Sequence, residues 1–191
     1  MLKQAKSPDG YKHLLVYKKA EELLAETLNF TATFPHEKTI NDLEDQMNRS
    51  ARSVKANIVE GWKRNATHEY YTFLGYSIAS NTELLEDYLD ICLGRYEAKG
   101  LPAASSAAQA GVKGVNGING ATNEKGAKGG NGKQMSREEL ESFRFYPLDS
   151  RLPLSVQLYL RAKELNMLLD KLQVSLVERI TGRLSLPTIM R

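Results

Sequence analysis

Residues 46–61 read QMNRSARSVKANIVEG and carry a clear helical pattern. Their apolar side chains recur every three or four residues, and the same stripe extends back to residue 43. The stripe consists of Leu43, Met47, Ala51, Val54 and Ile58. This spacing is typical of an amphipathic helix that packs one face against other elements. We therefore predict a helix that is capped by Thr39, with Asp42 at the third position, and that ends at Gly61.

The same helical period continues on both sides of this stretch. It predicts a helix over 12–31, whose apolar positions are Val16, Ala20, Leu23, Leu24, Thr27 and Leu28, and another over 67–95. Ser136 and Glu139 form the pattern of a capping box for a short helix, and a long apolar stripe predicts a last helix over 154–180. No segment suggests a strand. We expect an all-α protein, an up-down-up-down four-helix bundle.

The segment 98–136 differs from the rest of the chain in composition. It holds nine of the 14 glycines, runs of Ala and Ser, several Asn-Gly steps and no aromatic residue. Such a composition is typical of a flexible linker. We predict a long disordered insertion between helices 3 and 4. Residues 1–97 would then hold helices 1–3, and residues 137–191 would supply the short helix and the helix that completes the bundle.

Several functional classes lack their residues in this sequence. The single cysteine, Cys92, cannot form an intramolecular disulfide or a cysteine-based zinc site. The three histidines lack the spacing of a zinc helix, and neither a nucleophile motif nor a phosphate-binding glycine loop occurs. No stretch approaches the roughly 20 apolar residues of a membrane span. We expect a cytoplasmic protein that is not an enzyme and needs no metal or cofactor.

The charges are unevenly distributed along the chain. The net charge of +3 comes from 26 basic and 23 acidic residues, and it divides into −3 over 1–97, +4 over 98–136 and +2 over 137–191. Against the acidic balance of the first segment, residues 46–65 hold five basic residues and one acid, Glu60. These five, which we call the basic row, are Arg49, Arg52, Lys55, Lys63 and Arg64.

The basic row has two readings. At about 100° per residue, its first four members fall within an arc of about 120° beside the apolar stripe. A row of this kind can follow a phosphate backbone, which predicts nucleic-acid binding that weakens with salt. It is also what an ordinary solvated helix face looks like. Nearby, Trp62, Tyr70 and Tyr71 could stack on unpaired bases or close the end of the core.

Polar residues at expected apolar positions are a second anomaly. Ser77 and Asn81 fall within the apolar arc of the third predicted helix, whereas Asn57 and Glu60 flank the arc of the second. Buried polar groups need hydrogen-bond partners. We therefore predict that these side chains form hydrogen bonds that tie the second and third helices together.

These residues resemble a known family. Residues 46–61 resemble the signature Q-x-x-R-A-x-x-S-x-x-x-N-I-A-E-G of the four-helix bundle proteins encoded in intervening sequences of bacterial 23S ribosomal RNA genes. Residues 15–20, Phe34-Pro35 and residues 71–86 resemble further family motifs, so the resemblance covers about residues 11–97. The positions that match the family's polar motif are Arg49, Ser53, Asn57, Glu60, Gly61, Ser80 and Glu83.

The resemblance implies more than a fold. The family is similar to the accessory variability determinant of diversity-generating retroelements, a basic pentameric four-helix bundle that binds RNA and its reverse transcriptase. A homo-oligomer, with a pentamer as one state, and RNA or a reverse transcriptase as partner are therefore implied here. The segments after residue 97 look like those of longer relatives with a C-terminal suffix region. The alternative is a protein–protein assembly module with no role in nucleic-acid binding.

Overall fold

A computed structural model describes residues 7–104 and 134–181 of the chain and contains no strand within those ranges. Its helices are α1 (Leu15–Thr31), α2 (Lys38–Lys63), α3 (Thr67–Cys92), α4 (Arg137–Ser142) and α5 (Leu154–Thr181). Two short 3-10 helices, η1 (Gly10–His13) and η2 (Glu97–Lys99), precede α1 and follow α3. The prediction of an all-α protein is confirmed.

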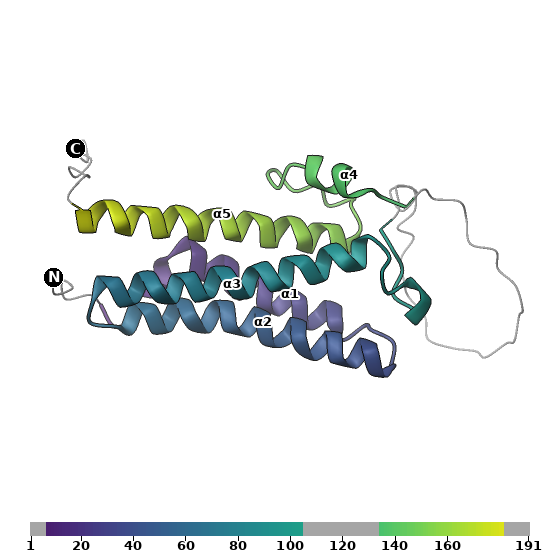
Figure 1. Ribbon diagram of the computed structural model, residues 1–191, viewed down its shortest axis with the longest axis horizontal. Helices are drawn as coiled ribbons and strands as arrows, with labels where there is room; N and C mark the ends of the chain where they lie inside the picture. The colour runs from purple at the N-terminus through teal and green to yellow at the C-terminus, as the bar shows by residue number, and fades with distance from the viewer. Residues whose placement is uncertain (1–6, 105–133, 182–191) are drawn as a thin grey trace, which may run out of the picture.

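The four long helices pack side by side, each antiparallel to the next (Figure 1). Contacts between α2 and α3 run in opposite chain directions, from Gln46–Asp87 to Val54–Ser77. The same holds for α1 and α2, which are joined by Thr31–Asn48 and Lys55–Glu21. It also holds for α3 and α5, joined by Asn81–Asn166 and Tyr71–Gln173. The up-down-up-down order is therefore confirmed, with α5 as the fourth long helix.

The core combines the apolar stripes with a few paired polar groups. The stripe of α2 is buried as predicted, since its five members are between 0 and 6% exposed. Thr27 is also fully buried, and its hydroxyl lies 2.7 Å from Tyr88 Oη across the bundle. Leu28, which was expected in the buried stripe of α1, is instead 46% exposed. It lies at the outer edge of α1, where the bundle leaves a groove.

Both predicted ends of α2 are wrong by a few residues. Its cap is Glu37, whose Oε2 accepts hydrogen bonds from the backbone nitrogens of Thr39 and Ile40. Glutamate is not among the preferred capping residues, so the sequence pattern favoured Thr39. At the other end the helix continues past Gly61 to Lys63. A Cβ on Gly61 would lie 2.8 Å from Phe73 Cβ, so this glycine permits close packing of α2 and α3 rather than ending the helix.

Two other boundaries also differ from expectation. Helix α1 begins at Leu15, after η1, rather than at residue 12, and α3 ends at Cys92 rather than near Arg95. The capping box of Ser136 and Glu139 is confirmed at the start of α4.

The predicted linker has ends that pack on the bundle. Leu101, Ala104 and Met135 are each 5% exposed or less. The backbone N–H of Ala104 donates to Cys92 O, and that of Met135 donates to Ala104 O. The remaining part of the predicted insertion, 105–133, lies outside the described residues. The two described ends therefore belong structurally with the bundle.

Candidate nucleic-acid interface

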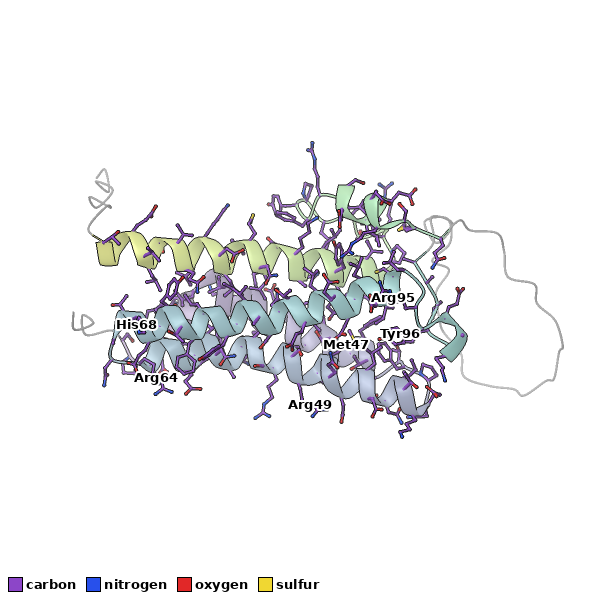
Figure 2. The ribbon with its side chains drawn as sticks, in the orientation of Figure 1. Met47, Arg49, Arg64, His68, Arg95 and Tyr96 are labelled. Carbon is purple, nitrogen blue, oxygen red and sulfur yellow. The ribbon has the colours of Figure 1, made fainter. Side chains whose placement is uncertain are left out.

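Arg49 and Arg52 lie on the outer side of α2, one turn apart. The Arg49 side chain is 75% exposed and projects from α2 away from α3, whereas Met47 lies between the helices (Figure 2). Its guanidinium lies 3.6 Å from Asp45 Oδ2, an ion pair that is open to solvent on both sides. Exposed pairs of this kind stabilise a protein by at most about 1 kcal/mol and exchange readily. Arg52 is exposed and forms no ion pair with the described residues.

Lys55, the third member of the basic row, is held by a neighbouring helix. Its Nζ lies 2.9 Å from Glu21 Oε1 of α1 and 5.6 Å from the centre of the Tyr17 ring. The hydrogen bond raises the pKa of Lys55 and lowers the pKa of Glu21. The Lys55 charge is thus neutralised within the bundle, which a count of charges along α2 alone could not show.

The last two members of the basic row lie at the far end of α2. Lys63 is exposed, with its Nζ 5.7 Å from the centre of the Tyr11 ring. Arg64 pairs with Glu60 one turn earlier, and its guanidinium carbon lies 4.6 Å from the centre of the Phe73 ring. At 1.5 Å per residue, this end is roughly 20 Å from Arg49. The basic row is therefore exposed at Arg49 and Arg52 and again at Lys63, whereas Lys55 and Arg64 are paired with carboxylates.

A groove of about 400 Å³ opens between α1 and α2 beside Arg49 and Arg52. Its lining residues are Leu24, Leu28, Asp45, Asn48, Arg49 and Arg52. Of these residues, the sequence pattern pointed only to the two arginines, because both leucines fall within the predicted apolar stripe of α1. Leu24 and Leu28 are spaced i, i+4 at the edge of that stripe, which places them on the same side of the helix. This spacing was the sequence signal that could have indicated an exposed apolar wall.

The aromatic residues near Lys63 close the end of the bundle. Tyr70 is 2% exposed, and Trp62 packs edge-on against it with ring centres 6.2 Å apart. The indole Nε1 of Trp62 donates to Ser7 O, and Gly10 packs against the same ring. The Trp62 and Tyr70 rings are therefore part of the packed core. The groove lined by Leu24 and Leu28 is a more open apolar surface beside the basic row than these rings are.

Most of the polar motif residues lie along the contact between α2 and α3. Ser53 Oγ accepts hydrogen bonds from Asn57 and from Ser80, and Glu83 accepts one from Ser50. The expected tie between α2 and α3 is also made by Ser77, which donates to Val54 O.

Three residues of this group bond elsewhere. Asn57 donates to Ser53 within α2, so it does not itself reach α3. Asn81 donates to Ala162 O and to Asn166, both at 2.7 Å, and so ties α3 to α5 instead. Glu60 pairs with Arg64 on the same helix and is exposed. Of the four residues expected to join α2 and α3, Ser77 therefore does so, whereas the other three bond within α2 or to α5.

Among the described residues, neither the cysteine nor the metal-binding residue types form a reactive site. Burial raises the pKa of the Cys92 thiol to about 11, which keeps it protonated. Within residues 7–104 and 134–181, no group of three or more His, Cys, Asp or Glu side chains could hold a metal ion. No helix in the same ranges is long and apolar enough to cross a membrane.

Comparison with known proteins bears on the first three helices. Residues 12–96 match the model of the family described as 23S rRNA-intervening sequence protein. The matched segment contains α1, α2 and α3 and therefore both walls of the groove. The predicted resemblance to this family is confirmed over these residues. No significant match is found among curated proteins or among solved structures.

Proposed function

We propose, from the match of residues 12–96 to the 23S rRNA-intervening sequence protein family and from the surface of α2, that this chain is a non-catalytic helical bundle that binds structured RNA. Binding would centre on Arg49 and Arg52. Lys63 would add a contact at the end of α2. Lys55 and Arg64 would contribute less, because Glu21 and Glu60 pair with them.

The exposure of Arg49 and Arg52 is the observation that carries this proposal. A guanidinium donates two hydrogen bonds to a phosphate, and Arg52 has no carboxylate partner among the described residues to give up. The partner of Arg49 is exposed and therefore a weak competitor for it. The two side chains also share one helix face, so both can reach the same strand.

The direct test is the affinity of the full chain for an RNA hairpin, measured by fluorescence anisotropy. We expect the double variant Arg49→Ala/Arg52→Ala to bind at least about tenfold more weakly than the unmodified protein. The matched control is Lys18→Ala/Lys38→Ala, which removes two exposed charges of the same sign from α1 and α2. An equal effect of both double variants would reject a site at Arg49 and Arg52.

We also propose that the chain self-associates. Its resemblance implies a pentamer as the expected state and a reverse transcriptase as a protein partner.

The second candidate function is an assembly module whose helix faces bind protein subunits alone. Among the described residues, seven large apolar side chains are 40% exposed or more, and this observation favours protein contacts. Light scattering with and without RNA separates the two, because a stable oligomer that retains no RNA would favour the assembly module.

A further inference from the structure

We propose that the groove between α1 and α2 binds an unpaired nucleotide, with its base against Leu24 and Leu28 and its phosphate on Arg49 and Arg52. The inference rests on the proposed function and narrows it from RNA in general to RNA with an exposed base. It also gives a role to Leu24 and Leu28, which phosphate binding by the basic row does not involve.

The two walls of the groove differ in chemistry. Leu24 and Leu28 of α1 form an apolar wall, and Leu28 is 46% exposed although it lies beside a well-packed core. Arg49 and Arg52 of α2 supply positive charge on the other wall. A nucleotide carries the matching pair of surfaces, an apolar base face and an anionic phosphate. The groove volume of about 400 Å³ is within the roughly 300–1,000 Å³ of small-molecule sites.

Two further polar groups of the groove fit the edge of a base. Asn48 Oδ1 accepts a hydrogen bond from the buried hydroxyl of Thr31 at 2.9 Å, and this orients the amide and leaves its Nδ2 as a donor. Asp45 offers a carboxylate acceptor one turn away on the same helix. Unpaired bases expose amino or imino donors together with carbonyl or ring-nitrogen acceptors. Base pairing would occupy those groups.

The same residues disfavour an acidic protein helix as the occupant. A helix bound in a groove needs an apolar stripe that spans several turns, at i, i+3, i+4 and i+7. The apolar wall here consists of Leu24 and Leu28 alone. Asp45 repels a peptide carboxylate and a phosphate alike, so its charge does not choose between these two anions. A base edge, in contrast, donates hydrogen bonds to this carboxylate.

The test uses three RNA hairpins that share one stem. The first is fully paired, the second has one bulged adenosine, and the third has an abasic ribose at the bulge, which keeps the phosphate and removes the base. By fluorescence anisotropy with the full chain, we expect the bulged adenosine to increase the affinity about tenfold over either of the other hairpins.

Variants assign this preference to the groove. Leu28→Ala should abolish the preference for the bulged base over the paired hairpin. The matched control is Leu15→Ala, a leucine of the same helix that is 55% exposed and does not line the groove, and it should keep the full preference. Arg49→Ala/Arg52→Ala should weaken binding of all three hairpins. Circular dichroism of each variant checks that the fold is retained.

Each alternative outcome is distinguishable. Equal affinity for the three hairpins, still dependent on Arg49 and Arg52, would overturn the nucleotide site and leave the proposed function intact. Failure to bind any hairpin would overturn both. Tight binding of an acidic amphipathic peptide that Leu28→Ala abolishes, with no preference for the bulged base, would overturn the inference in favour of a protein partner.

Discussion

Lys55 Nζ of α2 lies 2.9 Å from Glu21 Oε1 of α1, so a cation in the middle of the basic row is neutralised by a neighbouring helix. The two side chains are 30% and 54% exposed, which makes the pair accessible to solvent and to competing anions. The contact separates Arg49 and Arg52 from the charges at the end of α2. It also places a carboxylate where it would oppose the proposed binding of RNA.

Removal of that carboxylate should strengthen RNA binding. Glu21→Gln frees the Lys55 ammonium for a phosphate, and we expect the affinity for an RNA hairpin to rise about threefold at low salt. Glu22→Gln is the control, because it makes the same change in net charge at an exposed neighbouring position. If both variants raise the affinity equally, the effect is due to net charge and not to Lys55.

Gly61 should not tolerate a methyl group. A Cβ there would lie 2.8 Å from both Phe73 Cβ and Tyr70 Cδ2, so α2 and α3 would have to move apart. We expect Gly61→Ala to lower the free energy of unfolding by about 1–3 kcal/mol, measured by urea denaturation. Gly75→Ala is the control, since its Cβ would meet only the flexible Gln173 side chain within 4 Å at 3.3 Å. The gain in helix propensity should make that change neutral or stabilising.

Asn81 should be coupled energetically to Asn166. The fully buried Asn81 donates to Asn166 Oδ1 and to Ala162 O, and so joins α3 to α5. We expect Asn81→Ala to lower the free energy of unfolding by about 2 kcal/mol, because it removes two buried hydrogen bonds. In a double-mutant cycle with Asn166→Ala, the coupling should exceed about 0.5 kcal/mol. Additive effects of the two substitutions would contradict this contact.

Asp87 should make the protein less stable as the pH rises. Burial, aided by the charges of Asp90 and Glu83, raises its pKa from 3.8 to about 6. Between these two values the folded state keeps a proton that the unfolded state has released, so the free energy of unfolding falls as the pH increases. Asp87→Asn should remove this part of the pH dependence and stabilise the protein at neutral pH by about 1 kcal/mol, after allowance for solvent screening. Denaturation curves at several pH values measure it, and identical slopes for the variant and the unmodified protein would contradict the prediction.

The sequence predicted the helices well because their packing follows short-range periodicity. The stripe from Leu43 to Ile58 is buried as its spacing indicates, and the capping box at Ser136 depends on residues three positions apart. Helix ends were less predictable. The Glu37 cap is an unfavoured residue type, and Gly61 is required by its contact with Phe73, far away in the sequence.

The candidate site was predictable only in part, because its properties come from two helices. The helical arc of α2 contains Arg49 and Arg52, and they lie on one exposed face as expected. Lys55 pairs with Glu21 of α1, and the helical arc of α2 alone cannot reveal a partner on another helix. The groove itself likewise exists only where Leu28 of α1 lies beside α2.

The salt dependence of binding measures whether Arg49 and Arg52 contact RNA phosphates, as we propose. The slope of log affinity against log salt counts the phosphate contacts that are made. For Arg49→Ala/Arg52→Ala we expect a slope shallower by about two than that of the unmodified protein, whereas Lys18→Ala/Lys38→Ala should leave it unchanged. An unchanged slope in the arginine variant would show that these two arginines do not contact RNA phosphates.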